Sequence, residues 1–177
     1  MTRFPTGLAF VPSVALAVLL ATGAAQAQPP EHDEVARLLR ADQPAEALRR
    51  ADELLATRPK DAQLRFLKGV AQSRNGEPDA ASETFSALTQ DYPELPEPYN
   101  NLAVLHAAAG RLEAARTALE TALRLSPGYA TAYQNLGDVY ARLAVKAWQR
   151  ALELDPANPA LRPRLQLLQQ LPTESSR

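Results

Sequence analysis

Residues 96–140 read PEPYNNLAVLHAAAGRLEAARTALETALRLSPGYATAYQNLGDVY, and this stretch repeats itself. Tyr99 and Leu102 recur 34 residues later as Tyr133 and Leu136. The same spacing extends through the chain in columns of similar residues. These columns are Pro59, Pro93 and Pro127; Ala47, Ala81 and Ala115; Gly76 and Gly110; Leu54, Leu88 and Ala122; and Gly69, Ala103 and Gly137. Several independent columns at one spacing indicate an internal repeat.

The spacing within each unit predicts a helix, a tight turn and a second, antiparallel helix. Gly76 and Gly110 suit the left-handed conformation that ends a helix. A glycine inside a helix, as at Gly69 and Gly137, costs about 1 kcal/mol relative to alanine, so we expect a neighbouring helix to pack closely there. A proline such as Pro127 closes the unit because it has no N–H for the next helical hydrogen bond.

Helix start and stop signals predict eight helices along the chain. They span residues 32–41, 44–57, 61–74, 78–90, 97–109, 112–125, 130–154 and 160–170. The fourth unit is five residues short, because Pro156 follows Pro127 after 29 residues instead of 34. No glycine, proline or polar cluster separates Leu143 from Ala144, so a single helix replaces the hairpin. Either the last helix or a second copy of the chain is expected to cover its far part.

These columns resemble the tetratricopeptide repeat, in which an aromatic residue, Leu-Gly, Tyr, Ala, Phe and Pro recur at this period. The matching residues are Tyr99, Leu102, Ala103, Gly110, Ala115, Ala122 and Pro127, then Tyr133, Leu136, Gly137 and Tyr140. The resemblance implies an all-α fold: an α-solenoid of antiparallel helix pairs, with fused helices in the last repeat and a C-terminal capping helix. The domain covers residues 28–171, with repeats at about 28–61, 62–95, 96–129 and 130–158 and the capping helix at 160–171. The first repeat departs from the pattern, since Asp42 stands where a glycine would end the helix.

Residues 1–27 have the pattern of a secretory signal peptide. Arg3 gives a positive start, an apolar run follows, and Ala25 and Ala27 form a small-x-small cleavage site. We predict cleavage after Ala27, no stable membrane span afterwards, and a periplasmic location. The alternative is an uncleaved membrane anchor, because the apolar run is almost long enough to cross a bilayer. At the other end, residues 172–177 are predicted to be disordered.

The composition excludes several classes of function. Lys and Arg number 19 against 20 Asp and Glu, so there is no basic excess to attract nucleic acid. The absence of cysteine excludes disulfides, thiolate nucleophiles and iron–sulfur clusters. His32 is expected at a solvated N-terminus and His106 as a packed, hydrogen-bonded side chain, which leaves little for a metal site or an acid/base relay. We therefore expect neither an enzyme nor a cofactor or metal protein.

The candidate binding surface consists of side chains on the first helix of each unit that point away from the second helix, into the concave groove of the solenoid. These residues are Phe66, Val70, Arg74, Asn100, Asn101, Val104, Gln134, Asn135, Asp138 and Arg142. The resemblance implies that an Asn at the equivalent positions 101 and 135 hydrogen-bonds the backbone of an extended ligand. The alternative is that Asn before Leu-Gly is only a common choice of the repeat. The Lys and Arg residues with which chaperone-binding members hold a ligand's carboxylate are not matched in this chain.

Two classes of function follow. The first is a periplasmic adaptor or scaffold that binds a peptide or helix of another cell-envelope protein in the groove. The second is a structural, self-assembling protein that forms a homo-oligomer through the long helix of the fourth repeat and the C-terminal helix. The five tyrosines, Tyr92, Tyr99, Tyr129, Tyr133 and Tyr140, are expected to serve helix packing and interface edges rather than to form a ligand cage.

Overall fold

A computed structural model describes residues 30–169, which form eight α-helices and no strand. All predicted helices are confirmed, and their ends agree to within two residues. The helices are α1 (Pro30–Arg40), α2 (Pro44–Thr57), α3 (Ala62–Arg74), α4 (Pro78–Asp91), α5 (Pro96–Ala108), α6 (Leu112–Leu125), α7 (Ala130–Leu154) and α8 (Leu161–Gln169). The predicted signal peptide and C-terminal tail lie outside the described residues.

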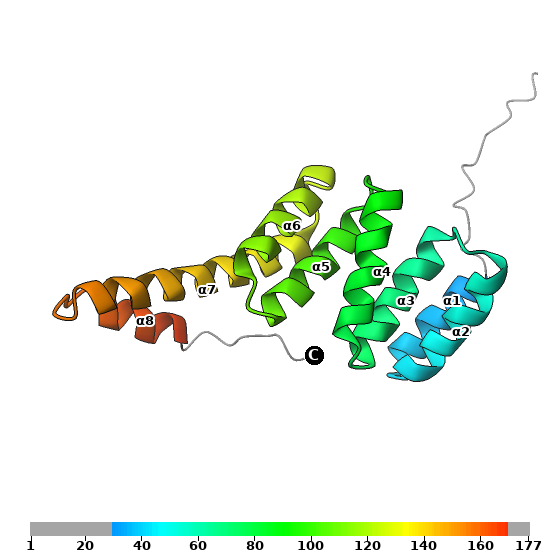
Figure 1. Ribbon diagram of the computed structural model, residues 1–177, viewed down its shortest axis with the longest axis horizontal. Coiled ribbons are helices and arrows are strands. Elements are labelled where there is room, and N and C mark those ends of the chain that lie inside the picture. The colour runs from blue at the N-terminus through cyan, green and yellow to red at the C-terminus, as the bar shows by residue number, and fades with distance from the viewer. Residues whose placement is uncertain (1–29, 170–177) are drawn as a thin grey trace, which may run out of the picture.

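The helices stack in the order of the sequence, so that each packs on the one before and the one after it (Figure 1). Contacts also run between first helices of neighbouring units, from α1 to α3 and from α5 to α7. This arrangement is the predicted α-solenoid of antiparallel helix pairs. None of the helices that the structure describes is long and apolar enough to cross a membrane.

The residues at helix ends explain why the units are so regular. Pro44 and Pro78 begin α2 and α4, where the missing proline N–H would have had no helical partner in any case. Gly76 and Gly110 follow α3 and α5 with φ of 79° and 74°, as predicted for residues that end the first helix. Asp42 occupies the equivalent position of the first unit and adopts the same left-handed region, with φ of 55°.

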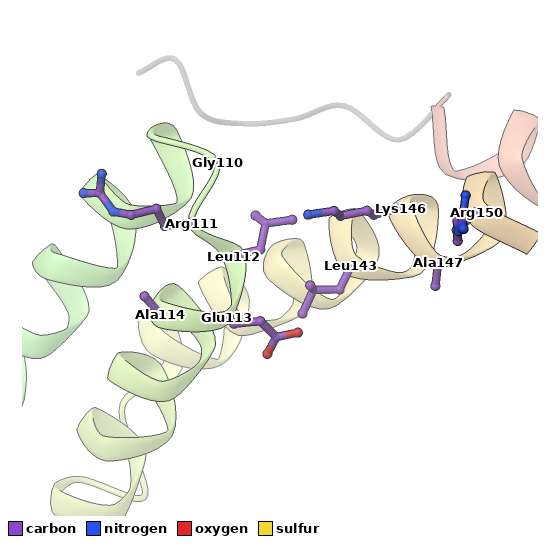
Figure 2. Close-up of a pocket in the computed structure, with 9 residues that line it drawn as sticks. All are labelled: Gly110, Arg111, Leu112, Glu113, Ala114, Leu143, Lys146, Ala147 and Arg150. Carbon is purple, nitrogen blue, oxygen red and sulfur yellow. The ribbon is translucent and has the colours of Figure 1, made fainter.

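The fused helix predicted for the fourth unit is confirmed as α7, a single helix of 25 residues. We call Ala130–Leu143 its near half and Ala144–Leu154 its far half. The near half packs on α6, whose first residues lie beside the middle of α7 (Figure 2). The far half is covered by α8, in which Pro163 occupies the first turn and so breaks no helical hydrogen bond.

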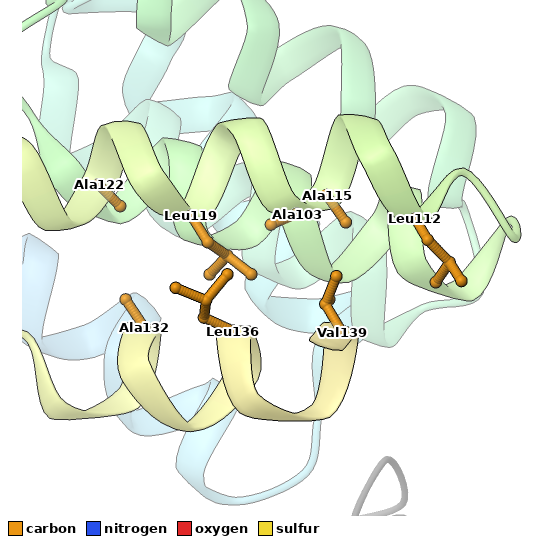
Figure 3. Close-up of a cluster of buried hydrophobic side chains, with 8 residues drawn as sticks. All are labelled: Ala103, Leu112, Ala115, Leu119, Ala122, Ala132, Leu136 and Val139. Carbon is orange, nitrogen blue, oxygen red and sulfur yellow. The ribbon is translucent and has the colours of Figure 1, made fainter. Parts of the chain in front are cut away.

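Alanines at the helix crossings keep the units close together. Ala47, Ala81 and Ala115 belong to one column of the repeat, and all three are fully buried. Larger apolar residues fill the space beside them, Phe85 in the second unit and Leu119 in the third. Figure 3 shows the cluster of the third and fourth units, where α5, α6 and the near half of α7 meet. The column of small residues therefore marks the helix contacts, as predicted.

The glycine column needs a correction at its last member. A Cβ added to Gly69 would lie 2.7 Å from the ring of Phe85, so the second helix of that unit does pack closely against it. At Gly137 the added Cβ would have no neighbour within 4 Å. The expectation of close packing at Gly137 is wrong because the second helix of its own unit continues straight on instead of folding back. For the same reason Tyr133 and Tyr140 are 56% and 48% exposed and do not belong to the core.

Candidate protein-binding site

The ten residues predicted to line the groove lie on α3, α5 and α7, the first helices of the second, third and fourth units. On α3 two of the three serve packing. Phe66 is half-buried with its ring 5.7 Å from that of Phe85, and Val70 is half-buried against the same core. Arg74 is exposed and donates a hydrogen bond to the carbonyl of Leu39, which ties α3 to the first unit. The α3 end of the predicted surface is therefore mainly structural.

The two asparagines of α5 are already bound within the protein. Asn100 is only 6% exposed, and its side-chain oxygen accepts a hydrogen bond of 2.8 Å from Asn135 of α7. Asn101 is half-buried and donates to the backbone carbonyl of Glu97, one turn earlier in its own helix. Asn100 was predicted to line the groove, but the neighbouring unit covers its side chain. The amides of Asn101 and Asn135 would have to exchange these partners to bind a ligand.

Four of the predicted residues remain open to solvent next to this asparagine pair. Val104 of α5 is 47% exposed, and Gln134, Asp138 and Arg142 of α7 are exposed. We call these four residues the groove face. It combines an apolar side chain with an amide, a carboxylate and a guanidinium, so it can both donate to and accept from the backbone of a bound segment.

A separate hollow lies between the start of α6 and the middle of α7 (Figure 2). This open groove has a volume of about 520 Å³, and none of the ten predicted residues lines it. Its α6 wall includes Leu112 and Glu113, and its α7 wall includes Lys146, Ala147 and Arg150. The sequence feature that could have predicted this groove is the fused helix. Because α7 continues without a turn, its residues Lys146, Ala147 and Arg150 lie beyond the start of α6.

The two histidines have structural roles. His32 is buried and its Nε2 lies 2.9 Å from the carboxylate of Asp61, so the expectation of a solvated side chain is wrong. Asp61 also caps α3 by accepting from the Leu64 N–H. Burial alone would raise the pKa of the Asp61 carboxyl, but the bonds from Leu64 and His32 and the charge of Arg58 lower it below its usual value.

His106 is packed and hydrogen-bonded, as predicted. It is half-buried at the end of α5, and Arg111 donates from Nε to its Nδ1 at 3.2 Å. Burial, with a smaller effect of the Arg111 charge, lowers the pKa of the His106 imidazole. Within residues 30–169 no group of three or more His, Asp or Glu side chains is arranged to hold a metal ion.

Two family models match adjoining parts of the chain. A tetratricopeptide repeat model matches residues 38–105, and a second, described as TPR repeat, matches residues 105–143. Through residues 38–143 the chain belongs to the tetratricopeptide repeat (TPR) family. The TPR resemblance inferred from the glycine, alanine and proline columns is thereby confirmed, together with the fold class.

A plant relative and two solved structures show how far the likeness extends. The chloroplastic TPR domain-containing protein PYG7 of Arabidopsis thaliana is 38% identical over 79 residues, which cover 42% of this chain and 26% of that protein. The TPR protein TTC0263 of Thermus thermophilus has a TM-score of 0.61 at 24% identity, covering 78% of this chain and 79% of the other. The second TPR domain of human RPAP3, solved with the HSP70 peptide SGPTIEEVD, has a TM-score of 0.57 at 17% identity, covering 62% and 92%. The two structures share the fold with this TPR chain.

Proposed function

We propose that this TPR protein is a non-enzymatic interaction module of the bacterial periplasm that binds a segment of another cell-envelope protein on its groove face. The observation that carries the proposal is the groove face itself. Val104, Gln134, Asp138 and Arg142 stand exposed on two neighbouring first helices, while the Asn135–Asn100 hydrogen bond holds these helices together.

The chemistry of the groove face indicates the kind of segment it accepts. Asp138 and Arg142 lie one turn apart on α7, so the surface offers both charges and matches a segment with mixed charge better than a strongly acidic or basic one. A related domain, the second TPR domain of human RPAP3, is solved with a bound peptide. A protein segment is therefore the class of ligand that both the fold and the surface favour.

The periplasmic location rests on the signal-peptide pattern of residues 1–27. The near balance of 19 basic and 20 acidic residues suits a protein that binds neither nucleic acid nor an anionic membrane surface. An exported adaptor also needs no cysteine, and the chain has none.

Affinity capture from an envelope extract, with the exported form of the chain as bait, tests the proposal. The captured protein is then bound in solution to a double variant, Gln134→Ala with Asp138→Ala. Both side chains are exposed, so the variant should fold normally and bind at least tenfold more weakly, as for loss of central contacts worth about 1.4 kcal/mol or more.

A matched control comes from the second helices. Gln90→Ala with Arg124→Ala removes two exposed side chains from α4 and α6 and should leave binding unchanged. If the control weakens binding and the groove-face variant does not, the partner binds on the outer surface and the proposal is wrong.

A further inference from the structure

One side of the near half of α7 is exposed, although the repeat pattern predicts that the second helix of the unit packs against it. Tyr133, Gly137 and Tyr140 follow one another at helical spacing, and all three are exposed. In the second unit the equivalent side of α3 is closed by the unit's own second helix, where the Phe85 ring lies against Gly69. In the fourth unit the corresponding space beside Gly137 is empty within 4 Å.

The side chain that should fill this space is present in the chain but out of reach. Phe85 stands eight residues before the closing Pro93, and Trp148 stands eight residues before the closing Pro156. Trp148 is therefore the fourth unit's counterpart of Phe85. It lies eleven residues beyond Gly137 on the same straight helix, so their Cα atoms are about 16 Å apart.

The surroundings of Trp148 are those of Phe85 with one side missing. Phe85 packs between the first helix of its own unit and Leu102 of the next first helix, and it is fully buried. Trp148 has the second of these neighbours, because Arg164 of α8 lies 5.9 Å from its ring centroid. It lacks the first and remains half-buried. The far half of α7, with α8 attached, is thus a second helix without its first helix.

We propose that two copies of the chain exchange these halves. The far half of α7 from each copy packs antiparallel on the near half of the other, so that each Trp148 occupies the empty space beside the other copy's Gly137. The pair of long helices is related by a two-fold axis close to their middle, and such an interface closes on itself without growing into a fibre. Each fourth unit then regains the hairpin packing of the second and third.

The sizes of the side chains on this face match a second copy. In the register that pairs Gly137 with Trp148, Tyr133 comes level with Leu152 of the other copy and Tyr140 with Val145, each one residue beyond an alanine, Ala151 or Ala144. Ala144 and Ala151 lie on the same side of the helix as Trp148, so the side chains nearest to the two tyrosines on that side are small. A self-complementary strip of this kind is what an isologous interface requires.

The charges beside the strip also match. Lys146 and Arg150 are exposed on the flank of the far half that faces the start of α6. In the exchanged pair this flank lies beside α6 of the other copy, whose exposed Glu113 and Glu120 each lie within 4 Å of Arg116 of their own helix, as Arg150 lies 2.6 Å from Glu153 of its own. Lys146 is the basic side chain of this flank that can approach them, and an opposite charge at the rim of an interface favours this partner and this orientation.

The groove face is left free in such a dimer. Gln134 and Asp138 each follow a residue of the bare strip, and one residue turns the helix by about 100°. The exchange is therefore independent of partner binding on the groove face, and each can be tested without the other.

Sedimentation equilibrium of the exported protein, made by expressing the full-length chain, tests the exchange. The wild type should have twice the mass of one chain. Gly137→Leu should be a monomer with unchanged helical circular dichroism, because its side chain finds open space in a single chain but fills the position of Trp148 in the pair. Gln134→Leu introduces the same leucine on another side of the near half, and this variant should remain a dimer. A monomeric wild type, or a Gly137→Leu protein that stays dimeric, would overturn the proposal.

Disulfide trapping tests the register. The chain has no cysteine, so the pair Tyr133→Cys and Ala151→Cys, which keeps Gly137 and Trp148, is the sole source of thiols. The two Cα atoms are about 27 Å apart in one helix, beyond the roughly 4–7 Å of a disulfide, so oxidation should link two chains. A control pair, Tyr133→Cys with Glu153→Cys, should not cross-link. A disulfide within one chain would show a closed hairpin, and no disulfide at all would show unpaired halves; either result contradicts the exchange.

Discussion

Gly69 is the position where packing and helix propensity oppose each other most clearly. A Cβ added there would lie 2.7, 2.8 and 3.1 Å from three ring atoms of Phe85, which is fully buried. Overpacking of this kind costs about 1–3 kcal/mol, whereas alanine gains about 1 kcal/mol over glycine inside a helix. Gly69→Ala should therefore destabilise the protein by about 1 kcal/mol, and by at most about 2 kcal/mol.

The third unit shows how the clash is avoided. Its equivalent residues are Ala103 and Leu119, so an alanine at the crossing coexists with a leucine in place of the phenylalanine (Figure 3). Phe85→Leu in the second unit reproduces this pair. In a double-mutant cycle, Gly69→Ala should cost less in the Phe85→Leu background, with a coupling energy of about 1 kcal/mol or more.

Urea denaturation of the wild type, the two single variants and the double variant measures the cycle. The midpoints should change while the slope m stays constant, because the surface exposed on unfolding is almost the same. If Gly69→Ala alone were as stable as the wild type, or if the two substitutions were additive, the ring of Phe85 would not be what restricts position 69.

Three further predictions concern the core, the pH response and the leader. Ala115→Leu should destabilise the fold by about 1–3 kcal/mol, while the exposed Ala157→Leu should change it by less than about 0.5 kcal/mol; equal urea midpoints would contradict the repeat alignment. The lowered pKa of His106 favours its neutral form in the fold, so the free energy of unfolding should fall as the pH drops below about 6.5. Urea midpoints at about pH 7.5 and 5.5 measure this fall, and it should be smaller for His106→Gln. The exported protein should begin at Gln28, and an intact mass that still includes residues 1–27 would favour the anchor instead.

The elements that the sequence predicted best are those marked by local chemistry. Gly76 and Gly110 identified the ends of α3 and α5 because few other residues adopt a positive φ. The fused helix α7 followed from the absence of any turn residue between Leu143 and Ala144. Such signals depend on one residue and its backbone conformation, so they can be recognised without knowing which residues pack against it.

The predictions that failed depend on residues far apart in the sequence. His32 is buried because it meets Asp61, 29 residues later, and Asn100 is covered by Asn135, 35 residues later. Side-chain pairs between units follow from the stacking geometry and not from the period. Gly137 failed for a related reason: its column predicted a contact that requires the second helix to fold back, and the fused helix removes it.

Site-specific photo-crosslinking in living cells tests the central claim, that the groove face binds another envelope protein, most directly. A photo-reactive amino acid placed at Gln134 should capture one partner protein, and the same amino acid at Gln90, exposed on the outer surface of α4, should capture none. Mass spectrometry of the adduct identifies the partner. Adducts from Gln90 and none from Gln134 would contradict the account.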